Sequence, residues 1–266
     1  MQSDYVHGYS ETEAGRLSDQ AHTLEELLHH DTFFPAGCRV LEAGCGTGAQ
    51  TAILARRCPG AQITSIDLSE SSLEAAEHRL CQAGLDLVTF EKADIYHLPY
   101  DAGSYDHVLV CFVLEHLARP VEALKELKRV LVPGGTLTAI EGDHGSFYCH
   151  PETPEAHRVV QCLIDLQGQM GGNALIGRQL FPLLRQAGFR EVNVTPRVVY
   201  VDGSRPEWEE GFSRNTFIAM VEGVATQAIA RGLIVEDTWV KGIKALNAAT
   251  GEHGTFHYTF FKGLAQ

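Results

Sequence analysis

A glycine-rich turn, VLEAGCGTG at residues 40–48, sets the strongest limit on how this chain can fold. It joins the apolar run 38–44, which is typical of a buried strand, to a segment with helical spacing. Gly44, Gly46 and Gly48 let the backbone turn sharply and let a ligand come close, and the following helix presents unpaired N–H groups. The turn alone indicates either a nucleotide-type site in an α/β protein or a tight turn without a ligand.

Strand-like and helix-like segments alternate after this turn. Apolar runs at 61–69, 87–94, 105–117 and 136–142 predict strands, and 70–83 and 120–131 have helical spacing. This alternation is typical of βαβ units, and it predicts a parallel sheet with helices on both faces.

The segments before residue 38 and after residue 142 do not show this regular alternation of strands and helices. We expect helices near 11–30, 175–189 and over most of 206–249, and strands at 190–201 and 254–263, with Pro196 marking an edge strand or a bulge. Residues 142–174 look irregular and polar, with a helical patch near 155–170. We therefore predict one domain, 1–266, with an N-terminal helical lid (1–35), a core (38–141) and two helical cap insertions (142–174 and 202–250).

Charge and cysteine content narrow the class of protein. The net charge of −13 argues against a nucleic-acid partner, which needs a basic face. Seven irregularly spaced cysteines indicate neither a disulfide framework nor a zinc site. The first residues lack the apolar segment of a signal peptide, and no run reaches the ~20 apolar residues of a membrane span. We expect a cytoplasmic protein with no membrane partner.

Carboxylates occupy three predicted strand ends. The glycines form a Glu-x-Gly-x-Gly-x-Gly pattern, which differs from the GxGxxG of dinucleotide-binding dehydrogenases and from a P-loop. Glu42 is expected to place a negative charge beside the ligand, which favours a cation over a pyrophosphate. Asp67 can accept both hydroxyls of a ribose, and Asp94, in KADIYHLPY, can hold the amino group of adenine.

At this point the chain resembles the class I S-adenosylmethionine-dependent methyltransferases. The resemblance rests on VLEAGCGTG, SIDLS, KADIYHLPY, YDHVLVCFVLEHL and LKRVLVPGGTLTAIE, and it covers about 38–141 in order, with a weaker tail through 263. It implies a Rossmann-like sheet of seven strands, mostly parallel, whose last strand is antiparallel, and S-adenosyl-L-methionine as cofactor. The positions it assigns to cofactor binding are Glu42, Gly44, Cys45, Gly46, Gly48, Gln50, Asp67, Leu68, Ala93, Asp94, Ile95 and Cys111.

The N-terminal segment is either a packing helix or a lid over the cofactor. In related methyltransferases this segment folds over the cofactor, which makes Tyr9, Arg16 and Gln20 candidates for the methionine carboxylate or the closed pocket. Arg16 suits a carboxylate because its guanidinium can bind in a bidentate manner.

Two groups of residues are candidates for the chemistry. Glu115 and His116 lie where the substrate meets the methyl group in this family; the alternative is a helix-capping pair. Histidine titrates near neutral pH, so His116 can act as a general base. The stretch EGDHGSFYCHP (141–151) is either a solvated loop or a wall of the site, with Asp143 and His144 as catalytic candidates.

Further residues are candidates for binding the acceptor. Glu141 and Tyr148 belong to the same stretch, and Asn173 and Arg178 can hold a substrate carboxylate unless they belong to an ordinary loop and helix. The histidines lack the spacing of a metal site, so no metal is predicted. Trp208, Phe212, Phe217 and Met220 indicate a cap core or a dimer surface in preference to a cofactor-binding site.

These observations predict methyl transfer to a small-molecule acceptor, with N-methylation of a polar amine or imidazole compound first. The alternatives are an O- or C-methyltransferase of a biosynthetic metabolite and a non-catalytic cofactor-binding protein. The protein is expected to act alone or as a homodimer.

Overall fold

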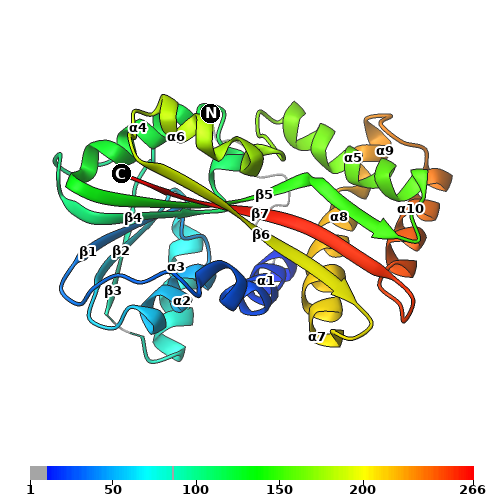
Figure 1. The fold of residues 1–266 in the computed structure, drawn as a ribbon, viewed down its shortest axis with the longest axis horizontal. Helices are drawn as coiled ribbons and strands as arrows, with labels where there is room; N and C mark the ends of the chain where they lie inside the picture. The colour runs from blue at the N-terminus through cyan, green and yellow to red at the C-terminus, as the bar shows by residue number, and fades with distance from the viewer. Residues whose placement is uncertain (1–10, 86) are drawn as a thin grey trace. The chain divides into compact units, whose positions relative to one another are not determined.

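The computed structural model describes residues 11–85 and 87–266, and its central feature is a seven-stranded sheet in the order β3-β2-β1-β4-β5-β7-β6 (Figure 1). The pairs β1–β2, β1–β4, β2–β3 and β4–β5 are parallel. Gln266 Nε2 donates to the carbonyl of Gly134, and the N–H of Thr259 donates to the hydroxyl of Ser146. Later residues of β5 thus lie beside earlier residues of β7, so the two strands run in opposite directions. The predicted mostly parallel α/β sheet, with an antiparallel last strand, is confirmed. The strands are β1 (Arg39–Ala43), β2 (Gln62–Asp67), β3 (Val88–Lys92), β4 (Tyr105–Cys111), β5 (Leu131–His150), β6 (Val192–Asp202) and β7 (Thr255–Ala265).

The helices follow the predicted segments closely. Helix α3 starts at an N-cap, Ser69, whose hydroxyl accepts the N–H of Ser72, as its sequence predicts. Thr153 caps α5 in the same way through the N–H of Ala156. The helical elements are α1 (Glu11–His29), α2 (Ala49–Arg57), α3 (Glu70–Gln82), η1 (Leu114–His116), α4 (Pro120–Val130), α5 (Pro154–Gln169), η2 (Ile176–Gln179), α6 (Leu180–Gln186), α7 (Pro206–Trp208), the π-helical η3 (Glu209–Ile218), α8 (Ala219–Gly223), α9 (Ala225–Ala230) and α10 (Glu236–Ala248).

The chain divides into two compact units. Unit 2 comprises 28–141, 177–196 and 261–266; within it α2 packs with α3 and α4 packs with α6, on opposite faces of the sheet (Figure 1). Its core is strand β4 and its neighbours, where Val108, Leu109 and Val110 are fully buried. Unit 2 holds every position that the resemblance assigns to the cofactor between Glu42 and Cys111.

Unit 1 comprises residues up to 27, 142–176 and 197–260, so both predicted insertions fall within it. Helix α5 packs on α10, and an aromatic cluster fills the interior, with Phe212, Phe217 and Phe256 each 1% exposed. Phe212 and Phe217 are therefore core residues of unit 1, as the cap-core interpretation predicts.

Two strand boundaries differ from prediction. The expected strand 105–117 ends at Cys111, because Phe112 adopts a φ of +58° that breaks the extended backbone. The segment 142–150 was predicted to be irregular, but it continues strand β5. There the buried Phe147 and Cys149 alternate with exposed Tyr148 and His150, a period-two pattern typical of a strand.

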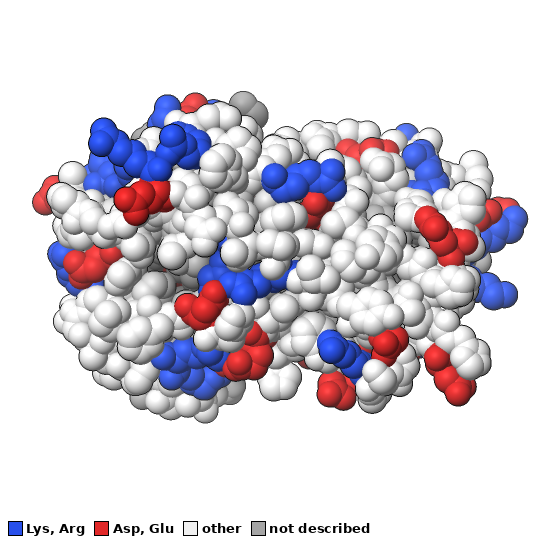
Figure 2. Space-filling model, viewed as in Figure 1, with Lys and Arg blue, Asp and Glu red and all other residues white. Residues whose placement is uncertain are grey.

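Pro196 lies on β6, the outermost strand, as its place in the sequence predicts. On the face drawn in Figure 2, acidic and basic side chains are interspersed. Helices long and apolar enough to cross a membrane do not occur in the described part of the chain.

Candidate functional site

The glycine turn that follows β1 contains one glycine facing open space and two that are packed. Gly44, Gly46 and Gly48 have φ values of +78°, +51° and +77°. A Cβ on Gly44 would lie 2.5 Å from Cγ2 of Val113, and one on Gly48 would lie 2.9 Å from Cβ of Ala76. A Cβ on Gly46 would meet no atom of the described residues within 4 Å, apart from its own chain neighbours. Gly46 therefore leaves space beside the strand ends that a ligand can fill.

Asp67, at the end of β2, holds this turn in place. Its Oδ2 accepts the N–H of Gly46 at 2.9 Å, and its Oδ1 accepts the N–H of Ser69 at 2.9 Å. Each carboxylate oxygen has two lone pairs, so these bonds leave room for hydroxyl donors. The next residue, Leu68, is 59% exposed and offers an apolar surface beside the carboxylate.

Asp94 lies beside Asp67, because the N–H of Ala93 donates to the carbonyl of Asp67 at 3.1 Å. The Asp94 side chain is 46% exposed, and its Oδ1 accepts the N–H of Tyr96 at 2.9 Å. Ala93 and Ile95 flank it and are half-buried. Two partly exposed carboxylates thus sit at neighbouring strand ends.

Glu42 differs from the expectation of a charge beside the ligand. It is 2% exposed, and its Oε2 accepts the hydroxyls of Thr51 at 2.6 Å and Ser65 at 2.7 Å. Burial raises the pKa of this carboxyl. Glu42 thereby ties β1 to α2 and β2 beneath the turn. Cys45 is also buried, at 6% exposure.

The turn after β4 is built on a buried glutamate. Glu141 is fully buried, and its Oε1 accepts the N–H groups of Val113 at 3.0 Å and Leu114 at 2.7 Å. Its Oε2 is buried without a hydrogen bond among the described residues. Burial and the nearby Glu115 raise the pKa of Glu141 well above its ordinary value. Glu141 thus positions η1 and does not line open space, which corrects its predicted role in binding the acceptor.

Glu115 and His116 are carried by this turn. Glu115 is 8% exposed, and Nε2 of His116 lies 3.8 Å from its Oε1. The strained φ of Phe112, just before the turn, is of the kind that collects at functional sites. Cys111 is 8% exposed, and burial raises the pKa of its thiol.

The remaining residues of the 141–151 stretch lie in unit 1, where some are buried and others are exposed. Asp143 is 3% and His144 is 5% exposed; Asp143 accepts the N–H of Gly145, and His144 Nδ1 lies 2.6 Å from the hydroxyl of Tyr258. Tyr148 is 55% exposed and stacks on His257 at 4.0 Å. The structure therefore does not gather them into one exposed polar wall.

The other predicted positions are scattered. Asn173, in unit 1, accepts the N–H of its own Leu175 at 3.0 Å, and Arg178, in unit 2, is an exposed residue of η2. Arg16 donates to Gln20 at 3.3 Å along α1. Tyr9 lies outside the described residues. Among the described residues, no group of three or more His, Cys, Asp or Glu is arranged to hold a metal ion.

Sequence reasoning missed a buried chain of hydrogen bonds that ends at Gln50. Lys262 Nζ donates to Thr32 Oγ1 at 2.6 Å, Thr32 lies 3.2 Å from Nδ1 of His29, and His29 Nε2 lies 2.9 Å from Gln50 Oε1. Burial lowers the pKa of His29 to about 4, so the ring is neutral at pH 7. Its Nε2 must then donate to Gln50. Nothing local in the sequence links Lys262 to a segment 230 residues earlier.

Residues 41–139 match the family model described as a methyltransferase domain. The chain is 34% identical over 209 residues to an uncharacterized 37.1 kDa protein in transposon TN4556 of Streptomyces fradiae, covering 77% of this chain and 59% of that protein. It is 35% identical over 132 residues to 27-O-demethylrifamycin SV methyltransferase of Amycolatopsis mediterranei, covering 49% of this chain and 48% of that protein. The chain thus spans about half the length of the curated relatives it matches.

Solved structures share the fold. The phosphoethanolamine N-methyltransferase 2 of Haemonchus contortus, solved with phosphomonomethylethanolamine and S-adenosylhomocysteine, superposes with a TM-score of 0.56. The identity is 16%, over 93% of this chain and 52% of that one.

The cofactor of this family is S-adenosylmethionine, and the residues of unit 2 fit it. The space beside Gly46 would be filled by any Cβ, and the carboxylates of Asp67 and Asp94 stand partly exposed at adjacent strand ends with the apolar Leu68 between them in sequence. On the motifs, the sheet order and the family match together, residues 41–139 form a methyltransferase domain of the class I S-adenosylmethionine-dependent type.

Proposed function

We propose that this protein transfers a methyl group from S-adenosylmethionine to a small-molecule acceptor. The observation that carries the proposal is the pair of strand-end carboxylates, Asp67 and Asp94, joined through the Ala93–Asp67 backbone bond beside the open position at Gly46. In this proposal Asp67 accepts the ribose hydroxyls and Asp94 accepts the amino group of adenine. Leu68 offers its exposed side chain to the flat base.

The cofactor, when bound, supplies an electrophilic methyl group on a sulfonium that is a good leaving group. The chain must then hold a nucleophile in line and remove its proton if the nucleophile arrives protonated. His116 suits this role, because it follows the strained end of β4 and Glu115 lies 3.8 Å from its Nε2, where a carboxylate favours the imidazolium formed on proton uptake. Glu141 fixes this turn by accepting two of its N–H groups.

For the acceptor atom, nitrogen of a polar amine or imidazole compound remains the first candidate. Glu141, Asp143 and His144 are buried, so they no longer support a polar wall facing a nitrogen acceptor. The remaining support is the general base His116 with its neighbouring carboxylate, Glu115. Oxygen is the second candidate, favoured by the likeness to a relative named as a 27-O-demethylrifamycin SV methyltransferase.

The test is methyl transfer from tritiated S-adenosylmethionine onto a panel of amines, imidazoles, phenols, alcohols, thiols and acids, with S-adenosylhomocysteine binding measured by calorimetry. We expect His116→Gln to keep cofactor binding and to lower kcat by about 10²-fold or more. Its rate should also lose the dependence on pH that a titrating base confers. His78→Gln is the matched control, since His78 is an exposed residue of α3 bonded to Gln82.

Each result has a distinct meaning. Turnover of phenols or thiols alone would exclude the nitrogen acceptor. Binding of S-adenosylhomocysteine without any turnover would indicate a non-catalytic cofactor-binding protein. Equal rates for the His116 and His78 variants would remove His116 from the chemistry.

A further inference from the structure

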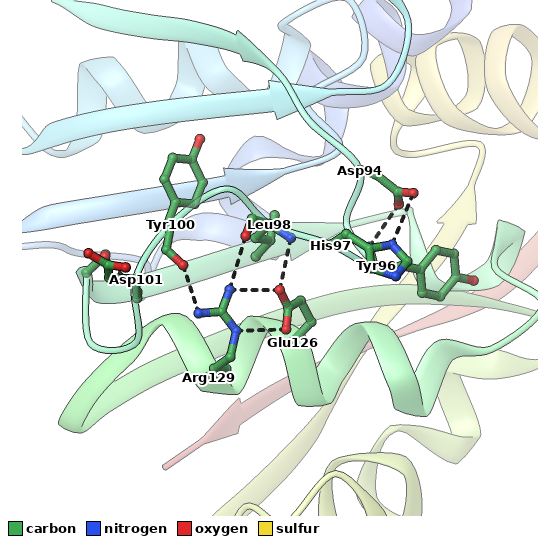
Figure 3. A network of polar contacts seen from close by, with 9 residues as sticks. Asp94, Tyr96, His97, Leu98, Tyr100, Asp101, Glu126 and Arg129 are labelled. Atoms are coloured by element: carbon green, nitrogen blue, oxygen red, sulfur yellow. Dashed lines mark hydrogen bonds and ion pairs between the residues drawn. The ribbon is translucent and has the colours of Figure 1, made fainter.

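Two side chains of helix α4 form hydrogen bonds with the backbone of the loop that follows Asp94. Glu126 Oε1 accepts the N–H of Leu98 at 2.9 Å, while Arg129 donates to the carbonyl of Leu98 at 3.1 Å and to that of Tyr100 at 2.8 Å (Figure 3). One ion pair thus satisfies three backbone groups of residues 98–100, which belong to none of the seven strands of the described sheet.

The two side chains also hold each other. Arg129 Nε donates to Glu126 Oε2 at 2.9 Å, and Nη2 donates to Oε1 at 2.8 Å (Figure 3). The side chains of Glu126 and Arg129 are 19% and 37% exposed. The Arg129 guanidinium holds the pKa of Glu126 below its ordinary value. A bidentate pair of this kind fixes direction as well as distance, which a lysine cannot reproduce.

Arg119, the residue just before α4, contacts the loop as well. The hydroxyl of Tyr96 accepts the N–H of Arg119 at 3.2 Å, and the Arg119 guanidinium lies 4.7 Å from the centre of the Tyr96 ring. The loop is therefore fixed at three alternate residues, at Tyr96 by the N-cap residue of α4 and at Leu98 and Tyr100 by α4 itself.

The direction of the Asp94 carboxylate depends on this loop. Its Oδ1 accepts the N–H of Tyr96 at 2.9 Å, and its Oδ2 lies 3.6 Å from Nδ1 of His97 (Figure 3). The N–H of His97 also donates to the Asp94 carbonyl at 2.9 Å. The Asp94 turn therefore ends one residue before Leu98, where Glu126 and Arg129 take hold. If the hydrogen bonds from Glu126 and Arg129 to Leu98 were lost, the turn could rotate and the Asp94 carboxylate would move with it.

We propose that Glu126 and Arg129 are positioning residues that set how selectively this protein recognises adenine. The pair acts through the loop and touches no ligand itself. The inference rests on the proposed function, because it requires that Asp94 read the amino group of the base. It extends that function by placing part of the base specificity on the outer helix α4.

The experiment compares binding of S-adenosylhomocysteine with binding of its inosine analogue, which has an oxygen in place of the adenine amino group. Calorimetry gives the ratio of the two Kd values for each variant. We expect the wild-type protein to prefer the adenine compound by at least about tenfold, because the inosine analogue lacks the amino group that donates a hydrogen bond to Asp94. Arg129→Lys should weaken adenine binding by about tenfold and bring the ratio close to one.

Arg39→Lys is the matched control. Arg39 makes the same kind of bidentate pair, with Asp106 at 3.1 and 3.2 Å, in the same unit but without contact to the 94–100 loop in the bonds it makes. Glu126→Gln serves if Arg129→Lys fails to fold, since it keeps the shape of the side chain and loses its charge. Melting temperatures of all variants confirm that the comparison is made on folded protein.

The proposal is supported if the ratio falls in the Arg129 or Glu126 variant and stays at the wild-type value in Arg39→Lys. It is overturned if both ligands weaken equally, because the pair would then stabilise the loop without setting its specificity. It is also overturned if the wild-type protein binds both compounds equally, a result that leaves the proposed function intact. If the wild-type protein binds neither compound, the proposed function fails as well.

Discussion

Alanine at Gly46 and alanine at Gly48 separate a ligand-facing glycine from a packing glycine in the same turn. Both positions have positive φ, +51° and +77°, so each variant carries the backbone strain of a side chain in the left-handed region. They differ in space. The new methyl group meets nothing within 4 Å at Gly46, but it meets Cβ of Ala76 at 2.9 Å and Leu80 at 3.3 Å at Gly48.

The magnitudes follow from these distances. Left-handed strain costs each variant about 1–2 kcal/mol of unfolding free energy. Gly48→Ala adds the cost of overpacking α2 against α3, about 1–3 kcal/mol, since the Ala76 backbone cannot move away easily. Each kcal/mol lowers the melting temperature of a chain of this size by about 2–4 °C. Gly48→Ala should therefore melt several degrees below Gly46→Ala.

Cofactor affinity should show the opposite order. At Gly46 the methyl group occupies space that the ligand is expected to fill, so the Kd for S-adenosylhomocysteine should rise by about 10- to 100-fold. At Gly48 it should stay within about threefold of the wild-type value when measured well below the melting temperature. Thermal melting and calorimetry on both variants test this. If Gly46→Ala binds S-adenosylhomocysteine as tightly as the wild-type protein, the ligand does not approach this glycine and the reasoning fails.

Two further predictions concern buried charges. Lys262 is 7% exposed and donates at 2.6 Å to Thr32, which is 6% exposed, and to Asp31, whose side chain is 44% exposed. Water can replace the lysine at Asp31, so Lys262→Met should cost about 1–3 kcal/mol of stability, chiefly because the buried Thr32 hydroxyl and Leu28 carbonyl lose this donor. Lys92→Met, which breaks an exposed pair, should cost less than about 1 kcal/mol in the same urea titration. Equal losses would show that burial does not govern the Lys262 interaction. The raised pKa of Glu141 means that the folded chain keeps a proton which the unfolded chain releases above its ordinary pKa of 4.5, so stability contributed by this group falls as pH rises from that value through the folded pKa, by up to about 1.4 kcal/mol per pH unit. Glu141→Gln should flatten this slope in urea titrations between pH 4.5 and 8, and an unchanged slope would mean that another group titrates there.

The sequence by itself determined the features that depend on neighbours along the chain. The glycine turn, the Ser69 cap and the alternation of strands and helices each arise from local backbone preferences, and the structure has them where the sequence places them. The order of five motifs was enough to identify the family. The motifs follow successive strands, and a parallel sheet brings the ends of these strands to one edge, where the cofactor binds in this fold.

Only the tertiary structure decided the role of residues whose partners are distant. The sequence does not say that Glu141 is buried and supports the turn at Val113, 28 residues earlier, nor that Lys262 reaches Asp31, 231 residues earlier. The same holds for Arg129, whose bonds to Leu98 cross 31 residues. A polar residue reads alike in sequence whether it faces a ligand or a buried partner, because burial is set by the packing of elements that are far apart in the chain.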